Sequence, residues 1–471
     1  MARRRRRRVP SLARWLDDRL RASNFARSAL NKIFPDHWSF MIGEVALYCF
    51  VVLVITGTYL ALFFRASSRD VVYNGAYAAL RGVHMSEAYQ STIRISFDVR
   101  AGLVIRQIHH WAALVFLGAI VTHLCRIFFT GAFRRPRELT WLTGVSLLLL
   151  ALFNGFSGYS LPDDLLSGTG LRIAYSIALS IPIVGTWAAF LFFGGPFPGD
   201  SIISRLFVFH VFIVPGLIIA LLSAHLAIIW HQKHTQFPGI GRTEHNIVGS
   251  RLWPTYAARS IGLFAAVFAV LAALGGLAQI NPVWLYGPYV PGAVSTAAQP
   301  DWYVGWLEGA LRLAPAWRLH VFGFTISELF WPAIVLPGVT FMLLFAWPFI
   351  EARVTHDRDE HNLLDQPRNR PVRTAIGTGV LAFYIVLFVA GSQDIIAQKL
   401  QASIVSVNNA LRVLLFLVPL VVALITWRIC RDLSSHDRKE ETGPPTWPPL
   451  SPAPAGDSRG FSRVAERVPP R

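Results

Sequence analysis

Eight long apolar stretches, separated by shorter polar segments, dominate this chain of 471 residues. Each stretch comes close to the roughly 20 residues that a helix needs to cross a bilayer. The pattern therefore predicts an all-α integral membrane protein with eight transmembrane helices, which we number first to eighth. The predicted helices lie at residues 40–64, 103–129, 141–161, 206–230, 261–280, 326–350, 374–390 and 410–430.

A further apolar stretch, residues 173–193, contains Pro182 and Gly185 and lies between polar turns. Counting it as a ninth span would put the basic segments that follow it on the opposite side of the membrane. Because cytoplasmic loops carry an excess of lysine and arginine, we expect this stretch to be a helix at the membrane surface.

Basic residues cluster at the ends of the apolar stretches and give the chain a net charge of +17. With eight spans, the arginines at 3–8, the connections after the second, fourth and sixth helices, and the segment after residue 430 all fall on one side. The positive-inside rule makes that side, with both termini, cytoplasmic. The charge thus reflects membrane topology and does not indicate nucleic-acid binding. The segment around residues 3–8 lacks the apolar region of a signal peptide.

The same pattern divides the chain into four regions. We expect a basic cytoplasmic segment at 1–38, a bundle of the first four helices at 39–235, the last four helices at 236–435, and a Pro-rich disordered tail at 436–471. Hydrophobic residues make up 53% of the chain and charged residues only 15%, against about a quarter charged in soluble proteins. The three cysteines are far apart and no CxxCH occurs, so neither a disulfide framework nor covalent haem is indicated.

Two histidines of the second helix share one helical face. His109 and His123 are fourteen residues apart, which in an α-helix is a rise of about 21 Å and a net rotation of only about 40°. His110 points about 140° away from His123 and faces elsewhere. A lone histidine in a bundle can simply be hydrogen-bonded, but ionisable groups inside a membrane are costly and are candidates for function.

The fourth helix repeats this arrangement with His210 and His225, which are fifteen residues apart, about 22 Å along the helix and about 60° around it. Pro215 between them can kink the helix and absorb some of that rotation. The second and fourth helices run parallel, so their histidines face each other at two levels. Opposed imidazoles suit the axial positions of haem iron, whereas zinc prefers three or four ligands.

Glycines repeat with a similar period in the first and third helices. Gly43 and Gly57 are fourteen residues apart in the first helix, and so are Gly144 and Gly158 in the third. Small residues allow close approach inside a membrane bundle and often serve helix packing alone. The same period on four consecutive helices favours flat cofactors at two levels.

Three arginines lie close to these histidines. Arg106 precedes the first histidine of the second helix by one turn, Arg126 follows the second histidine by one turn, and Arg205 comes just before His210. Each could pair with a haem propionate. The alternative for each is ordinary anchoring at the membrane interface.

At this point the chain closely resembles the cytochrome b subunit of the quinol–cytochrome c reductase (cytochrome bc) complex. The resemblance covers roughly residues 38–430 and is carried by RQIH…H, the two glycine pairs, GYSLP at 158–162, RLFVFH…H and PDWY at 300–303. The fifteen-residue step, PDWYVGWLEG and the long basic ends look most like the actinobacterial branch, which implies the plasma membrane of a bacterium.

The resemblance implies two non-covalent b haems. His109 and His210 would bind the iron of the low-potential haem near the outer face, and His123 and His225 that of the high-potential haem near the cytoplasm. It also implies two quinone sites, one outside and one inside. Quinol would be oxidised outside, with one electron passing to a Rieske iron–sulfur subunit and the other crossing both haems to a quinone, which contributes to the proton-motive force.

The outer site would lie at PDWY, where Asp301 and Tyr303 would neighbour the quinol, together with Tyr159 from GYSLP. Most relatives have glutamate where this chain has Asp301; a carboxylate one methylene shorter keeps a proton acceptor, and the change fits menaquinol. A carboxylate and a phenol beside Trp302 and Trp306 also suggest, from the residues alone, proton acceptors at a flat apolar pocket. Interfacial aromatic residues in a turn are the alternative.

The inner site is harder to locate. His231 falls near the inner-site histidine of the family, but the extra residue in the fourth helix shifts the register by one. His234, Glu244 and His245 are alternatives, and a solvated basic loop explains any one of them equally well.

The chain carries no site for an iron–sulfur cluster or a cytochrome c. The expected partners are therefore a Rieske subunit and a cytochrome c subunit, and the family implies a homodimer, with a terminal oxidase as a further candidate in a supercomplex. Two other classes remain open. A di-haem anchor of another quinone-linked oxidoreductase would lack the PDWY loop, and a secondary transporter would bind no haem and would show an internal repeat with broken helices.

Overall fold

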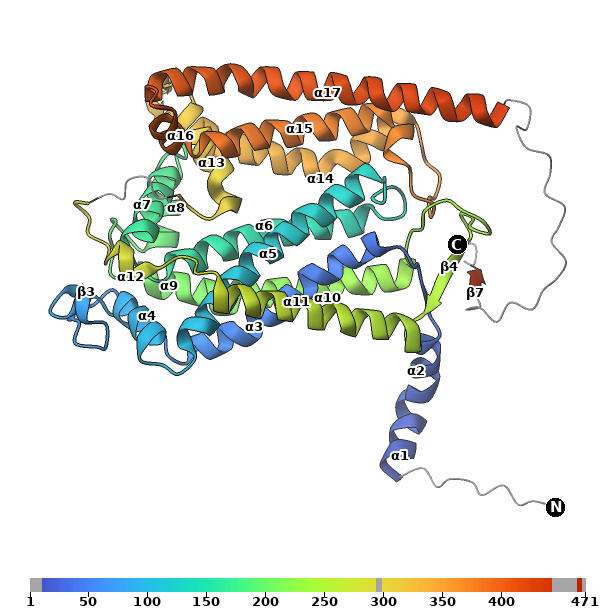
Figure 1. The fold of residues 1–471 in the computed structure, drawn as a ribbon, viewed down its shortest axis with the longest axis horizontal. Helices are drawn as coiled ribbons and strands as arrows, with labels where there is room; N and C mark the ends of the chain where they lie inside the picture. The colour runs from blue at the N-terminus through green and yellow to red at the C-terminus, as the bar shows by residue number, and fades with distance from the viewer. Residues whose placement is uncertain (1–10, 294–298, 443–463, 468–471) are drawn as a thin grey trace.

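The computed structural model describes residues 11–293, 299–442 and 464–467. Its long helices lie side by side in one bundle (Figure 1). In the described part of the chain, eight helices are long and apolar enough to cross a membrane, and they match the predicted spans in order. They are α3 (Ile42–Ala61), α5 (Gly102–Phe129), α6 (Glu138–Ser160), α9 continued by α10 (Ile202–Val208, Val214–Gln232), α11 (Ala257–Leu277), α14 (Leu336–Thr355), α15 (Pro371–Ala390) and α17 (Ile404–Thr442).

The helices form because a chain in hydrocarbon must satisfy its backbone hydrogen bonds within each segment. Many large apolar side chains on them are exposed, among them Phe212, Met342 and Phe416, as expected of surfaces that face lipid. Inside the bundle, α3 packs along α5, α6 along α10, and α15 along α17. The predicted membrane fold is therefore confirmed.

A π-helical turn interrupts the fourth span. It covers Phe209–Ile213, joins α9 to α10 and contains His210, and Pro215 follows directly in the first turn of α10. A π-turn takes up one residue more than an α-turn. The turn thus accounts for a fifteen-residue step in α10 where α5 has fourteen, and keeps His210 and His225 on one face.

The apolar stretch at 173–193 is helical and does not span the bundle, as expected, but its boundaries were wrong. It belongs to two short helices, α7 (Leu165–Leu179) and α8 (Gly185–Phe193), which lie across one end of the bundle (Figure 1). The helical conformation is interrupted between them at Pro182 and Ile183, and Ile183 has a φ of +68°. Both helices also line a cavity, so they do more than cover the surface.

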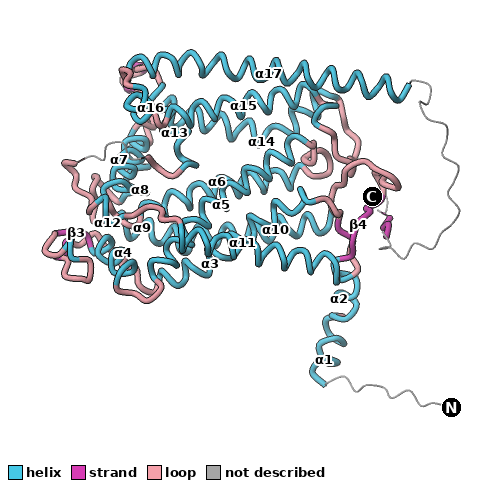
Figure 2. The backbone as a smooth tube through the Cα atoms, in the orientation of Figure 1, coloured by secondary structure: helices cyan, strands magenta, loops and turns pink. Residues whose placement is uncertain are grey.

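Short elements connect the spans at this end and at the opposite one (Figure 2). At the α7 end lie α4 (Glu87–Phe97), α12 (Val283–Tyr286), α13 (Trp302–Leu313) and α16 (Gln393–Leu400). Two hairpins, β2–β3 (Asp70–Val72, His84–Ser86) and β5–β6 (Leu319–Val321, Phe324–Ile326), are also present. At the other end β4 (Asn246–Arg251) pairs with β1 (Ile33–Phe34) and β7 (Val464–Arg467).

The terminal regions differ in part from the expectation. The N-terminal segment contains α1 (Ser11–Leu20) and α2 (Ala22–Leu30), which extend away from the bundle across the direction of the spans (Figure 1). The last span continues as helix to Thr442, beyond the predicted start of the tail at 436. Most of the tail that we expected to be disordered, 443–463 and 468–471, lies outside the described residues.

Candidate functional site

The first histidines of α5 and α10 face each other across the bundle. The ring centroids of His109 and His210 are 6.2 Å apart and the rings are 79° from coplanar. Two imidazoles that bind one metal ion from opposite sides, each with its nitrogen at about 2 Å, have centroids about 6 Å apart. The separation therefore fits a metal ion between the two rings. In the described part of the chain, no group of three His, Cys, Asp or Glu side chains converges on a metal site, so the imidazole pairs are the candidate ligands.

Each of the four predicted glycines stands against one of the four histidines. A Cβ atom at Gly57 would lie 3.0 Å from Cε1 of His109, one at Gly43 3.1 Å from Cε1 of His123, and one at Gly144 3.6 Å from Cε1 of His225. A Cβ atom at Gly158 would overlap the ring of His210. The absence of a side chain at these four positions of α3 and α6 therefore leaves room for the imidazoles and for a flat group between them.

Three of the histidines have a hydrogen-bond partner at Nδ1, which leaves Nε2 for a metal. Thr56 Oγ1 lies 2.9 Å from Nδ1 of His109, and Thr143 Oγ1 lies 2.8 Å from Nδ1 of His225. Nδ1 of His210 donates to the carbonyl of Asn154 at 3.0 Å. Such a contact selects the tautomer and fixes the ring orientation of a metal-binding histidine.

The fourth histidine lacks this support. Nδ1 of His123 is buried and has no hydrogen-bond partner. The difference follows from the residue before each glycine: Thr56 precedes Gly57 and Thr143 precedes Gly144, whereas Ile42 precedes Gly43. Our sequence analysis missed these threonines, although a hydroxyl residue just before a periodic glycine would have indicated them.

Two of the three predicted arginines have unused donors. Arg106 is 9% exposed and donates from both terminal nitrogens to the carbonyl of Asn281 at 3.2 Å, while its Nε is buried without a partner. Arg126 lies over the ring of Phe40, and its Nε and one terminal nitrogen are buried without partners. Buried guanidinium donors without partners are suited to bind an anionic group, and a haem propionate is such a group.

Arg205 differs from these two. It is half-buried, and Nη1 donates to the carbonyls of Phe190 and Leu191 near the end of α8, at 2.9 and 2.6 Å. Its guanidinium is therefore already used to hold α8, and the structure gives its predicted propionate contact no support.

Two cavities meet at the predicted outer quinol site. The histidine cavity, of about 420 Å³, contains His109 and His210 together with Gly57 and Gly158. The outer cavity, of about 990 Å³, lies between α6, α7, α8 and α13, and most of its lining is apolar. Three residues line both cavities: Tyr159, Asp301 and Tyr303.

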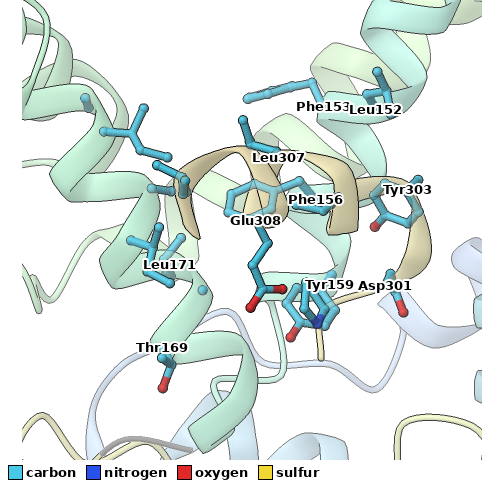
Figure 3. A pocket seen from close by; sticks show the side chains of 18 of the residues that line it. Leu152, Phe153, Phe156, Tyr159, Thr169, Leu171, Asp301, Tyr303, Leu307 and Glu308 are labelled. Atoms are coloured by element: carbon cyan, nitrogen blue, oxygen red, sulfur yellow. The ribbon is translucent and has the colours of Figure 1, made fainter. Parts of the chain in front are cut away.

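These three residues and Glu308 surround one end of the outer cavity (Figure 3). Tyr303 is 3% exposed, and its ring packs where a Cβ atom at Gly155 would approach to 3.0 Å. Burial and the neighbouring Asp301 carboxylate raise the pKa of the Tyr303 phenol well above its usual value. Tyr303 is therefore a neutral hydrogen-bonding group near neutral pH.

Glu308 is a functional candidate that our sequence analysis did not single out. It lies in α13, lines the outer cavity and has a buried Oε2 without a partner, while its other oxygen accepts from Arg312. Burial raises the pKa of the Glu308 carboxyl. Nη1 of Arg312 in turn donates to Asp394 at 3.0 Å. The residue is visible in PDWYVGWLEG, but the sequence alone does not tell which of its polar groups face a cavity.

At the opposite end of the bundle, the four candidates for the inner site separate. His231 and His245 are exposed. Glu244 accepts from the backbone of Asn362 and of Leu363 and so joins two loops. His234 has a buried Nδ1 without a partner, and its ring centroid is 4.8 Å from that of Phe34. Of the four, His234 alone combines a buried, unused polar atom with an aromatic neighbour.

Opposed histidines in a bundle of apolar helices, with glycines opposite each ring, define a b-type cytochrome fold. The comparisons with known proteins agree. A family model described as "Cytochrome b(N-terminal)/b6/petB" matches residues 114–288. A solved structure titled "Hyperthermophilic respiratory Complex III" has a TM-score of 0.65, covers 88% of this chain and 99% of that chain, and is 20% identical, which supports the fold alone.

Actinobacterial sequences give the specific family. Proteins named "Cytochrome bc1 complex cytochrome b subunit" are 54% identical in Mycobacterium tuberculosis, over 90% of this chain and 77% of the relative, and 49% identical in Streptomyces coelicolor, over 91% and 78%. The chain therefore belongs to the family of cytochrome b subunits of the cytochrome bc1 complex. The predicted resemblance, its actinobacterial branch and the enzyme class, a subunit of a quinol–cytochrome c reductase, are confirmed.

Proposed function

We propose that this chain oxidises a quinol, menaquinol, in the outer cavity and returns electrons to quinone at an inner site. The observation that carries this proposal is the wall of Tyr159, Asp301 and Tyr303 that the outer cavity shares with the histidine cavity. A quinol against this wall lies beside both a proton acceptor and the first pair of histidines. Oxidation of one quinol releases two electrons and two protons and leaves a quinone.

His109 with His210 and His123 with His225 would each bind one haem b, and Arg106 and Arg126 would pair with propionates. When bound, the two haems supply one-electron carriers between the outer and inner sites. The site between His123 and His225 is held by fewer hydrogen bonds, since His123 lacks a partner at Nδ1. The threonines and glycines beside these histidines would orient the imidazoles that hold each haem, and the apolar surroundings would exclude water from it.

The protein groups at the outer site divide the work on the substrate. The Asp301 carboxylate accepts a proton from a quinol hydroxyl, as a general base placed at the reacting group. The Tyr303 and Tyr159 phenols, which line the same wall, orient the quinol ring by hydrogen bonding. The apolar lining from α6, α7 and α8 takes the isoprenoid-like remainder of the substrate, as expected of a ligand pocket. Glu308 lines the same end of the cavity and offers a second carboxylate.

At the inner site we propose His234 as the residue that contacts quinone, in preference to the initially predicted His231. His234 has the buried unused nitrogen and the aromatic neighbour Phe34, whereas His231 is exposed. The basic connections at this end support a cytoplasmic position for it and for both termini. Quinone reduced there takes up protons from the cytoplasm.

As a member of this family the chain works in a complex. We propose a Rieske iron–sulfur subunit as the acceptor of the first electron, a cytochrome c subunit beyond it, a homodimer of the chain, and a terminal oxidase as a supercomplex partner. The proposed location of the complex is the plasma membrane of a bacterium. A di-haem anchor of another oxidoreductase is the second candidate, but it gives no role to the Asp301 and Tyr303 wall.

The test is quinol-dependent reduction of an external cytochrome c by the purified complex. We expect wild-type activity with menaquinol and a large loss in Asp301→Asn with both haems retained. Haem-containing wild-type complex that reduces no cytochrome c with any quinol would contradict the proposal and favour the anchor function. A preparation without haem would favour a transporter.

A further inference from the structure

His110, the residue after the candidate ligand His109, lines the histidine cavity and reaches the PDWY segment. Its Nε2 lies 2.9 Å from Oδ1 of Asp301, and the two side chains are only 14% and 15% exposed. The contact joins α5 to the start of α13 across 191 positions of sequence. The neighbouring histidines therefore serve two different surroundings: His109 faces His210, and His110 faces Asp301.

Asp301 departs from the ordinary behaviour of an aspartate before a helix. It occupies the N-cap position of α13, where an Asp side chain typically accepts from a backbone N–H of the first turn. The Asp301 side chain makes no such capping bond, although its backbone carbonyl accepts from the N–H of Val304 at 2.9 Å. The carboxylate is therefore held by another helix and not by its own.

We propose that His110 is a positioning residue for quinol oxidation, and this inference rests on the proposed function of the outer cavity. The imidazole anchors Oδ1 of Asp301 at the wall between the two cavities, so that Oδ2 is left to accept the proton of a quinol hydroxyl. Without the anchor, the carboxylate can rotate to cap α13 and leave the substrate. The role requires a hydrogen-bond donor at the position of Nε2 and no change in the charge of His110.

The short side chain of Asp301 makes this anchor necessary. A carboxylate on a single methylene has its position set by one χ1 rotamer, and the alternative rotamers of an N-cap aspartate point to its own helix. His110 reaches Asp301 from α5, a rigid span that also carries His109. The proton acceptor and His109, one of the first pair of histidines, are thus held by the same helix.

The experiment compares His110→Ala with His110→Gln in the whole complex. The glutamine amide nitrogen can occupy nearly the position of the imidazole Nε2 and can donate. Small displacements of a catalytic group can cost on the order of 100-fold in rate. We therefore expect His110→Ala to lower kcat for quinol-dependent cytochrome c reduction roughly 10- to 100-fold with little change in KM, and His110→Gln to recover most of the loss.

A double variant tests the route of the effect. If His110 acts through Asp301, adding His110→Ala to Asp301→Asn causes no further loss, because coupled residues are not additive. His84→Gln is the matched control: His84 lies 2.7 Å from Asp70 in the β2–β3 hairpin, but both side chains are about 70% exposed, and no change in kcat is expected. Haem content and midpoint potentials are measured for every variant.

The outcomes are distinguishable. A wild-type complex that does not oxidise quinol contradicts the proposed function itself. An active wild type with unchanged kcat in His110→Ala contradicts the positioning role, and so does a His110→Gln variant as impaired as His110→Ala. Loss of haem in both His110 variants would make His110 a structural support of the bundle and would also overturn the inference. Additive losses in the double variant would show that His110 does not act through Asp301.

Discussion

Thr143 Oγ1 lies 2.8 Å from Nδ1 of His225, and Thr143 directly precedes Gly144, whose missing side chain makes room for the same ring. One helix turn of α6 therefore both orients the histidine and leaves space beside it. Thr56 and Gly57 repeat the relationship with His109 on α3. In each pair, the hydroxyl and the missing side chain can be tested by separate substitutions.

Replacing Thr143 with valine keeps the shape of the side chain and removes the hydroxyl. Loss of a partner that orients a metal-bound histidine typically costs about 10- to 100-fold in metal affinity. We expect Thr143→Val to weaken haem retention at the His123 and His225 level while the other haem stays bound. Haem content after dialysis and a redox titration measure this. Ser146→Ala, which removes a hydroxyl that bonds only the Leu142 carbonyl of the same helix, is the control. Equal behaviour of the two variants would refute the orienting role.

Gly158 tests the space that the glycines leave. A Cβ atom at this position overlaps the His210 ring, so the ring must move, and overpacking a bundle interior costs about 1–3 kcal/mol. Gly158→Val should abolish haem binding at the His109 and His210 level, leaving one haem per chain by pyridine haemochrome assay. Gly262→Ala, where a Cβ atom meets nothing within 4 Å, should keep both. Two haems in Gly158→Val would show that the glycine has no such role.

The two inner-site histidines give different predictions. His234 has a buried, unpartnered Nδ1, whereas His231 is exposed. His234→Ala should slow reoxidation of the second haem by added quinone in stopped-flow measurements, on the order of the 100-fold that a lost proton-transfer group costs, and His231→Ala should leave it near wild type. The reverse ranking would restore the residue that the family register first suggested.

His234 also predicts a dependence of stability on pH. Burial, with the nearby charges of Lys32, Arg137 and Arg126, lowers its pKa from 6.5 to about 3. Between those values the unfolded state binds a proton that the folded state does not, so stability is complete above pH 6.5 and falls as the pH drops toward 3. The contribution is at most about 1.4 kcal/mol per pH unit.

The measurement for this prediction is the thermal midpoint of the detergent-solubilised complex at pH 7.5 and pH 5. His234→Gln should reduce the difference in Tm between the two pH values, whereas His245→Gln, at an exposed position in the same connection, should not. If both variants keep the wild-type difference, another group is responsible for it.

The sequence predicted the parts of this protein that follow from local physics. Eight spans are legible because hydrocarbon demands long apolar helices, and the histidine and glycine periods follow from the geometry of one helix at a time. The way in which the fourth span accommodates its fifteen-residue step could not be predicted from the sequence, because the π-helical turn at Phe209–Ile213 depends on backbone hydrogen bonding. The break at Ile183 was missed for a similar reason, since a non-glycine residue with positive φ leaves no residue-type signature.

Contacts between segments that are distant in the chain could not be predicted from the sequence. His110 was assigned to a different face from His123, but nothing in a helical period connects it with Asp301. Likewise, Glu244 and His245 resemble His234 as polar residues of one basic connection. Only the fold separates Glu244, which ties two loops together, from His234, which is turned toward Phe34.

The two proposed haem sites are stacked between α5 and the fourth span, each on a pair of histidines. The most direct measurement is the number of b haems per copy of this chain, combined with a redox titration, in the purified wild-type complex and in His123→Ala. We expect two haems that titrate in separate steps in the wild type, and one haem in the variant. A wild type without haem, or with a single haem that the variant retains, would contradict the stacked sites.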